Sequence, residues 1–505
     1  MQPLLKAIIV ALAVLASAPG APRAETPERP APTGGILSLL PAPQTTGHSI
    51  DVDGRTLRYQ ARAGTLSLLA GNADVTAEVF YVAYTLQADG APKAEAQRPV
   101  TFVFNGGPGA ASAYLHLGAL GPRVIATAAD GRFLPSPQTL IDNPGTWLDM
   151  TDLVFVDPVG TGYSREAPGQ ETRSFWGVDQ DAASLGAFIR LYLAQAGRSR
   201  SPVFLAGESY GGFRAALLAR TLQQDVGISP SGIVLISPAL EFMLVRPDQF
   251  DPLHLALELP SLAAVRLRRE GVTGPALRDR LAEVERFALG DYLVALASGL
   301  EPGGRTASAR VAEITGLPPD LVQRNFGRVT TGLFIKEFAR ARGNVLSPYD
   351  GMIETADMAP RSPRASGPDP ILDRSVPVLT SAFVAYARDE LNFRTDMSYR
   401  LLNEEISRNW EYGTGPSRQG YAGVMDDLQR ARSLNPAMGV LIVNGYTDLV
   451  TPYMTSRYLV GQVEAIPDAK PIRLDVLEGG HMMYFRPDSR RALKEAAAEL
   501  YRATE

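Results

Sequence analysis

The chain has 505 residues, of which 45% are hydrophobic and 20% are charged, and its formal net charge is -5. This composition is typical of a globular protein with a large core, and it excludes a disordered chain or a coiled coil. The sequence has no basic stripe that would neutralise phosphates, so nucleic-acid binding has no electrostatic support. The chain contains no cysteine, which excludes disulfides, thiolate metal sites, a cysteine nucleophile and a lipid-modified cysteine.

The N-terminus has the pattern of an export signal. A lone Lys6 precedes the apolar run 7–16, and small residues continue to Ala24. The run is short for a bilayer span, and small residues and prolines follow it instead of a stop-transfer pattern. We therefore expect residues 1–24 to be a cleaved signal peptide and the mature protein to be periplasmic or secreted, without stable membrane insertion. An uncleaved anchor is the alternative.

Two segments that differ in composition and hydrophobic pattern follow the predicted signal peptide. Residues 25–47 are rich in Pro, Ala and Gly and are expected to form a flexible lead-in without a core of its own. From residue 48 to residue 87, short alternating stretches such as 56–59 and 78–84 are separated by Gly and Asp-Gly turns. This alternation predicts an antiparallel edge of a sheet.

Continuous apolar runs, each ending in a Gly or Pro cluster, predict strands that are buried on both faces. The runs are 100–104, 153–156, 203–206, 233–236 and 439–443. Helical stretches such as 178–195 and 213–223 lie between them, and strand and helix in alternation indicate an α/β fold.

The region 240–427 breaks this alternation with charged helical segments and loops, among them 277–289 and 319–342. We expect it to be a helical cap inserted between two parts of the core, residues 48–239 and 428–505. A separate domain is the alternative.

One serine lies in the sequence context of a nucleophile elbow. The segment Gly207-Glu208-Ser209-Tyr210-Gly211 directly follows the run 203–206 and precedes a helical stretch. The flanking glycines admit a turn too tight for side chains, and the serine hydroxyl is pushed out at its tip. Ser209 is therefore the predicted nucleophile, with an ordinary strand-to-helix turn as the alternative.

A serine hydroxyl is a poor nucleophile until a neighbouring base takes its proton. Among four histidines, His481 is the candidate base because it follows a glycine pair on a loop after the alternating run 472–477. Asp448 lies on the loop after the run 439–443 and is the predicted acid that orients the imidazole. The chain order Ser209, Asp448, His481 is that of the α/β-hydrolases.

The oxyanion that forms during acyl transfer needs hydrogen-bond donors. In this fold one donor is the backbone NH of the residue after the nucleophile, here Tyr210, and another comes from a loop after an earlier strand. The glycine-rich segment 105–109 follows the run 100–104 and can supply it, and Gly107 is the residue we assign. A phosphate-binding loop is the competing interpretation, but no Lys-Ser or Lys-Thr follows the glycines.

Four segments together resemble the serine carboxypeptidase family of α/β-hydrolases, particularly its bacterial branch. They are Asn105-Gly106-Gly107-Pro108-Gly109, Asp157-Pro158-Val159-Gly160-Thr161-Gly162-Tyr163-Ser164, Gly207-Glu208-Ser209-Tyr210-Gly211-Gly212 and Gly479-Gly480-His481. The resemblance implies the α/β-hydrolase fold, with a mostly parallel central sheet flanked by helices and a helical cap. It also implies removal of C-terminal residues from peptides through an acyl-enzyme.

The resemblance further implies that Asn105, Gly106 and Glu208 hold the terminal carboxylate of the substrate. An amide and a backbone NH donate to a carboxylate directly, whereas a glutamate donates only when it is protonated. A solvated turn carboxylate is the alternative role for Glu208. The sequence departs from the family at Ala119, where many members have a second glutamate. Arg123 offers another partner for a terminal carboxylate, although a structural salt bridge is the favoured role.

Two other functions stay open. The same residues on the same fold would serve an esterase or an acyltransferase, and a non-catalytic binding protein could keep a hydrolase scaffold. A peptide is the expected partner, and the sequence implies no oligomeric state. No metal or organic cofactor is implied, because a triad and an oxyanion hole suffice for acyl transfer. Tyr114, His116 and Tyr210 are candidates either for walls of the substrate pocket or for the core.

Overall fold

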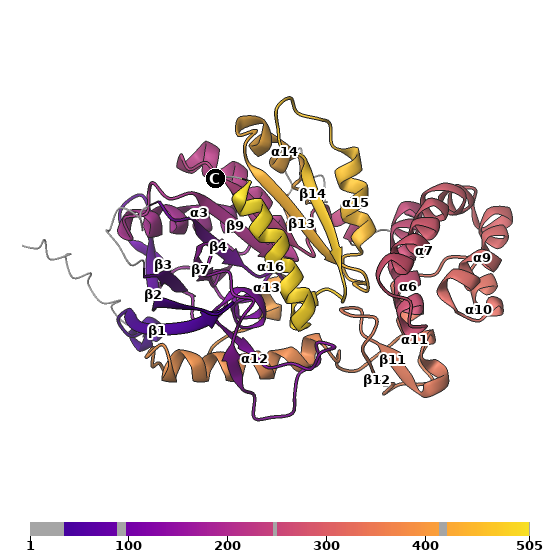
Figure 1. Cartoon of the computed structure of the whole chain (residues 1–505), viewed down its shortest axis with the longest axis horizontal. Coiled ribbons are helices and arrows are strands. Elements are labelled where there is room, and N and C mark those ends of the chain that lie inside the picture. Colours follow the sequence, from indigo (N-terminus) through magenta and orange to yellow (C-terminus); the bar gives the residue numbers. More distant parts are fainter. Residues whose placement is uncertain (1–34, 88–96, 246–249, 414–421, 504–505) are drawn as a thin grey trace, which may run out of the picture.

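The computed structural model describes residues 35–87, 97–245, 250–413 and 422–503. The predicted signal peptide, residues 1–24, lies outside the described residues, as does the lead-in up to residue 34. A central sheet carries helices on both faces, and a helical body lies to one side of it (Figure 1). Among the helices that the structure describes, none is long and apolar enough to cross a membrane.

A ten-stranded sheet has the order β1-β2-β3-β7-β4-β9-β10-β13-β14, with β8 paired to β3. The strands are β1 (Gln44–Val52), β2 (Arg55–Leu69), β3 (Val75–Leu86), β4 (Val100–Phe104), β7 (Asp152–Val156), β8 (Arg165–Glu166), β9 (Val203–Glu208), β10 (Gly232–Ile236), β13 (Gly439–Gly445) and β14 (Ile472–Leu477). Neighbouring strands pair antiparallel from β1 to β7 and parallel from β7 to β14. The mostly parallel α/β fold and its antiparallel edge are thereby confirmed.

The parallel strands β4, β7, β9, β10 and β13 are buried throughout because helices cover both faces of the sheet, whereas the edge strand β14 is half-buried. Every residue of β4 is buried, and its alternate side chains enter different apolar clusters: Phe102 and Phe104 enter one, and Val103 enters the other. The helices of the first face are α3 (Val178–Gln195), α4 (Tyr210–Thr221), α14 (Met425–Leu434) and α15 (Tyr453–Gln462). Those of the second face include α2 (Ala113–Leu115), α12 (Leu372–Asp389) and α16 (Pro487–Arg502).

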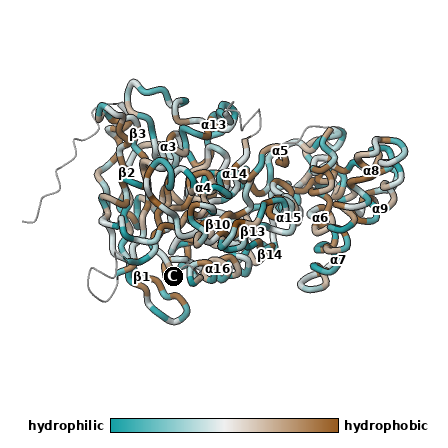
Figure 2. The backbone as a smooth tube through the Cα atoms, turned by 90° about the horizontal axis from the view of Figure 1, so that it is seen from above, coloured by the Kyte–Doolittle hydropathy of each residue, from teal (hydrophilic) through white to brown (hydrophobic). Residues whose placement is uncertain are grey.

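The helical body beside the sheet has an apolar cluster of its own. It contains α6 (Pro252–Arg269), α7 (Gly274–Phe287), α8 (Leu293–Ala297), α9 (Arg305–Thr315), α10 (Pro319–Arg324) and α11 (Thr331–Glu337). Figure 2 shows the same separation from a second direction. Leu449, on the loop after β13, joins this cluster and so attaches the body to the sheet. We call α6 to α11 the cap.

The cap is only one part of the region 240–427. Helix α5 (Phe242–Val245) packs against the core, and a small hairpin is formed by β11 (Asn344–Leu346) and β12 (Glu354–Ala356). Helix α12 also belongs to the core, and α13 (Glu404–Arg408) follows it. A second small hairpin, β5 (Arg123–Ile125) with β6 (Leu140–Asp142), lies in the first part of the core. The cap therefore packs against the loop after β13, and the chain returns to the core at α12.

Candidate active site

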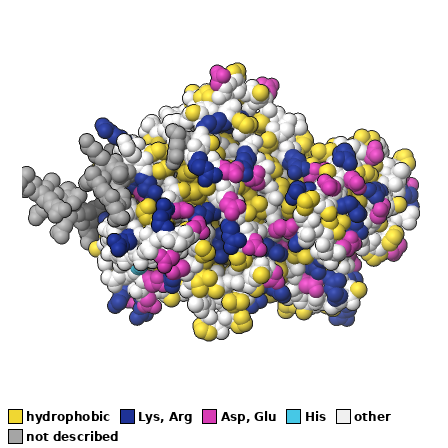
Figure 3. Space-filling model, in the orientation of Figure 1, with side chains coloured by type: hydrophobic (Ala, Val, Ile, Leu, Met, Phe, Trp, Pro, Cys, Tyr) yellow, Lys and Arg dark blue, Asp and Glu magenta, His cyan; other side chains and the backbone are white. Residues whose placement is uncertain are grey.

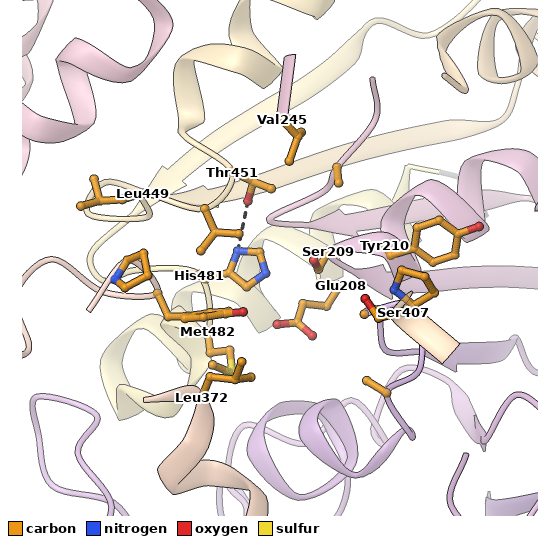
Figure 4. Close-up of a pocket in the computed structure, with 18 of the residues that line it drawn as sticks. Glu208, Ser209, Tyr210, Val245, Leu372, Ser407, Leu449, Thr451, His481 and Met482 are labelled. Atoms are coloured by element: carbon orange, nitrogen blue, oxygen red, sulfur yellow. Dashed lines mark hydrogen bonds between the residues drawn. The ribbon is translucent and has the colours of Figure 1, made fainter. Parts of the chain in front are cut away.

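Ser209 lies at the turn between β9 and α4. Its backbone has φ 59° and ψ -122°, a conformation that few non-glycine residues adopt and that a tight elbow requires. The neighbouring glycines leave no room for side chains, since a Cβ at Gly207 would lie 1.9 Å from the carbonyl oxygen of Gly211. The elbow presents Ser209 to a cavity of about 540 Å³ (Figure 4).

His481 and Asp448 come together at the same edge of the sheet, on the loops after β14 and β13. The Nδ1 atom of His481 lies 2.9 Å from Oδ2 of Asp448, whose side chain is fully buried. Burial disfavours a charged imidazole, but the charge and hydrogen bond of Asp448 outweigh it and raise the pKa of His481. Ser209 and His481 line the same cavity. The geometry thus brings together the three residues predicted as a triad.

The carboxylate of Asp448 is fixed by its own loop. Its Oδ1 atom accepts hydrogen bonds from the backbone amides of Val450 at 2.8 Å and Thr451 at 2.9 Å. The Thr451 hydroxyl lies 2.7 Å from Oδ2 of Asp448 and 3.1 Å from Nδ1 of His481, the contact drawn in Figure 4. Sequence reasoning missed Thr451, although a threonine three residues after the acid is a common turn partner for a carboxylate.

The glycine loop after β4 approaches the elbow at van der Waals distance. A Cβ at Gly106 would lie 2.6 Å from the backbone nitrogen of Tyr210 and 2.9 Å from Cβ of Ser209. Tyr210 is the first residue of α4, so its amide has no acceptor within the helix. Gly107 has φ 99° and lines the cavity. Gly107, Tyr210 and Ser209 therefore line the same cavity.

Glu208 is a buried acid that opens onto the cavity. Its Oε2 atom accepts from the side-chain amide of Asn105, and its Oε1 atom accepts from the hydroxyl of Tyr484 at 3.1 Å. Burial raises the pKa of Glu208, while the charge of His481 and the hydrogen bonds of Asn105 and Tyr484 oppose the rise. A solvated turn carboxylate is thereby excluded, since Glu208 is only 5% exposed. Sequence reasoning missed Tyr484.

The remaining residues considered from the sequence divide between pocket and core. Tyr114 and Tyr210 line the cavity. His116 is core, because it is fully buried, stacks on Phe155 at 4.1 Å and has its pKa lowered by burial to about 3. Arg123 forms salt bridges with Asp142 at 2.6 Å and Glu390 at 3.2 Å, so its role is structural.

The segment 157–164 is hydrogen-bonded to the chain just after the glycine loop. Asp157 is fully buried, and its Oδ1 atom accepts from both the backbone amide and the hydroxyl of Ser112. A Cβ at Gly162 would lie 1.7 Å from Oδ2 of Asp157, so this position requires glycine. The carboxylate therefore connects two loops around the nucleophile.

The cap adds a third group of polar side chains to the cavity. His254 and Glu258 of α6 and Thr331 of α11 line it, together with Phe242 and Val245 of α5. His254 lies in the region 240–427, and no pattern in the sequence assigned it a role. Its approach to the cavity depends on how the cap sits on the core, which no local pattern records. Both the sheet edge and the cap therefore contribute residues to the cavity wall.

Part of the chain matches a known family. Residues 60–230 match the serine carboxypeptidase family. This range contains Ser209 and the two loops at 105–109 and 157–164, and it ends before Asp448 and His481.

Curated carboxypeptidases from fungi are also similar to a part of this chain. The pheromone-processing carboxypeptidase KEX1 of Yarrowia lipolytica is 32% identical over 163 residues, which are 31% of this chain and 25% of the relative. The KEX1 protein of Komagataella phaffii is 30% identical over 199 residues, 39% of this chain and 29% of the relative. The chain therefore spans only about a quarter of the length of these curated relatives.

A solved structure extends the likeness to most of the chain. The prohormone-processing carboxypeptidase KEX1 of Saccharomyces cerevisiae superposes with a TM-score of 0.53 over 87% of this chain and 91% of its own. At 16% identity this shows that the two share the α/β-hydrolase fold.

Proposed function

We propose that this protein is an exported serine carboxypeptidase that removes C-terminal residues from peptides. The observation that carries the proposal is the buried acid Glu208 directly beside the nucleophile Ser209, in one cavity with His481. The match of residues 60–230 to the serine carboxypeptidases supports it independently of the geometry. The export signal at residues 1–24 supports a periplasmic or secreted location.

Acyl transfer is assigned to the three residues at the sheet edge. The Ser209 oxygen attacks the scissile carbonyl while Nε2 of His481 takes its proton, and Asp448 stabilises the imidazolium that results. The backbone amides of Gly107 and Tyr210 donate to the oxyanion. The imidazolium then gives its proton to the leaving amine, and the carbon–nitrogen bond breaks. Water attacks the acyl-enzyme with His481 again as base, which releases the shortened peptide and frees Ser209.

Selection of a chain end is assigned to Asn105, Gly106 and Glu208. The Glu208 carboxyl group binds a substrate carboxylate only as a donor, hence only when protonated. Burial raises the pKa of this group, which extends its protonated form toward neutral pH. The hydrogen-bond partner of Oε1 of Glu208 is the hydroxyl group of Tyr484, which carries no charge. A second glutamate is absent because that position is Ala119, which is buried away from the cavity.

The proposal is tested with three N-blocked substrates that share one dipeptide: the free acid, the C-terminal amide and a simple ester. We expect rapid release of the C-terminal residue from the free acid, little from the amide, and loss of activity on the free acid when Ser209→Ala is introduced. Equal cleavage of acid and amide would show that the cavity does not select a free carboxylate and would contradict a carboxypeptidase. Turnover of the ester alone would assign the protein to the esterases instead.

A further inference from the structure

His254 connects the cap to the wall of the catalytic cavity. It belongs to the first turn of α6, where Asp251 accepts from its backbone amide at 3.4 Å. Its Nε2 atom lies 3.0 Å from Oε1 of Glu258, one turn further along the helix. Glu258 is 5% exposed and is held in place by the hydroxyl of Thr331, which donates to the same oxygen at 2.7 Å.

The other ring nitrogen of His254 contacts an element outside the cap. Nδ1 lies 3.1 Å from the backbone carbonyl oxygen of Leu244, in α5. Helix α5 packs on the core and carries Phe242 and Val245, both of which line the cavity. The ring therefore bridges two elements that form adjacent parts of the cavity wall.

Both ring nitrogens of His254 contact hydrogen-bond acceptors. A backbone carbonyl oxygen and a carboxylate oxygen accept hydrogen bonds and cannot donate them. Each ring nitrogen must therefore carry a proton for both hydrogen bonds to exist, which makes His254 an imidazolium. A neutral ring keeps one proton, so one of its nitrogens would present a lone pair to an oxygen.

The charges around His254 favour this cation. Burial works against the charged ring, but the hydrogen bond and charge of Glu258, the carbonyl of Leu244 and the charge of Asp251 outweigh it and raise its pKa. Helix α5 supplies only that carbonyl, and Thr331 of α11 supplies a neutral hydroxyl to Glu258. The other titratable side chains that line the cavity are Tyr114, Glu208, Tyr210, Tyr349, Glu404 and His481.

We propose that protonated His254 is a positioning residue that holds α5 against α6 and so fixes the cavity wall formed by Phe242 and Val245. The inference rests on the proposed function, because the wall acts on the peptide that the cavity binds. When His254 loses its proton, one of its two hydrogen bonds is lost, and Phe242 and Val245 are no longer held in position. Substrate affinity is then highest when His254 is charged and falls as the pH rises through its pKa, while kcat stays under the control of Ser209, His481 and Asp448.

Two substitutions mimic the two protonation states of His254. In His254→Arg the guanidinium stays charged at every working pH and, like the imidazolium, carries N–H donors that point in diverging directions. In His254→Gln the side chain is neutral, like the deprotonated ring. KM and kcat are measured for each against wild type from acidic to mildly alkaline pH, and the ratio to wild type cancels the titration of Glu208 and His481.

At acidic pH we expect KM of the glutamine variant to exceed that of wild type by roughly fivefold, the usual effect of losing one hydrogen bond, and the excess to vanish at alkaline pH. The arginine variant is expected to match wild type at acidic pH and to bind more tightly at alkaline pH. The kcat values of all three proteins are expected to agree. His48→Gln, on strand β1 away from the cavity, is the matched control and is expected to leave the KM ratio at one. KM ratios that do not vary with pH, or changes in kcat alone, would overturn the inference.

The difference in melting temperature between wild type and His254→Gln tests the same contact without any substrate. Because the pKa of His254 is raised in the folded protein, the contact stabilises the fold at acidic pH and is lost as the pH rises. We expect the difference to shrink with rising pH. A constant difference contradicts the inference, whereas a shrinking difference in a protein that releases no C-terminal residue refutes only the proposed function.

Discussion

Glu208 is the residue at which burial and function are most closely linked. It directly precedes the nucleophile, and its carboxyl group accepts from Asn105 and Tyr484. Both hydrogen bonds favour the carboxylate, but burial favours the acid and is the stronger effect, so the pKa of Glu208 is raised. A raised pKa keeps the group protonated to higher pH than an exposed glutamate. Its ability to donate to a terminal carboxylate is present below that pKa and lost above it.

Glu208→Gln separates the donor from the titration. The amide of glutamine donates at every pH, so its affinity for a free carboxylate has no reason to fall as the pH rises. We expect the ratio of KM in this variant to KM in wild type to decrease steadily from acidic to alkaline pH. The measurement is KM for an N-blocked dipeptide acid in both proteins over that range. A ratio that stays constant would mean that Glu208 does not donate to the substrate.

At the scale of elements, three loops interlock around the nucleophile. Ser112 of the glycine loop is held by Asp157, and the amide of Asn403 donates to the carbonyl of Gly109 at 2.8 Å. The side-chain amide of Asn403 also donates to the carbonyl of Gly160 at 3.1 Å. The loop between α12 and α13 is therefore hydrogen-bonded to the other two loops.

Gly162→Ala tests this interlocking against Gly169→Ala. Both glycines have positive φ, so an alanine is strained at either position, by about 1–2 kcal/mol. At Gly169 nothing lies within 4 Å of the added Cβ, whereas at Gly162 it lies 1.7 Å from Asp157 Oδ2. We expect Gly162→Ala to lower the free energy of unfolding by about 2 kcal/mol more than Gly169→Ala, because the buried carboxylate must move. Denaturant unfolding of both variants measures the difference, and equal losses would show that Asp157 yields at no cost.

Much of the sheet was predictable from the sequence because burial on both faces leaves a plain signal. The apolar run 100–104 and the helical stretch 178–195 coincide with β4 and α3. The run 472–477 coincides with the half-buried edge strand β14, which was recognised from its alternation instead. The helical stretch 319–342 was only partly right. It is divided into α10 and α11 by a turn in which Phe326 and Gly327 have positive φ, a break that composition did not indicate.

The site was predictable where a residue lies beside its strand and unpredictable where it arrives from elsewhere. Ser209, Asp448 and His481 each follow a core strand, so the fold alone places them at one edge of the sheet. Tyr484 contacts Glu208 across 276 positions of sequence, and His254 reaches the cavity only because the cap packs on the core. Such contacts depend on tertiary packing, which no local pattern carries.

At the scale of the whole molecule, the cap and the sheet edge line one cavity. The cap has its own apolar cluster and joins the core through Leu449, next to Asp448. Cationic and anionic side chains are interspersed over the face in Figure 3, in line with the small net charge. No region of one sign on this face would steer a charged substrate, so selection is expected to occur within the cavity.

The most direct test of the central claim is a time course of one longer peptide, followed by mass spectrometry. A cavity that binds the terminal carboxylate of its substrate selects a chain end and shortens it one residue at a time. We therefore expect a ladder of products shortened successively from the C-terminus, no internal fragments, and no products with Ser209→Ala. Internal cleavage, shortening from the N-terminus, or a ladder that persists in Ser209→Ala would contradict the assignment of Ser209 and Glu208 to a carboxypeptidase site.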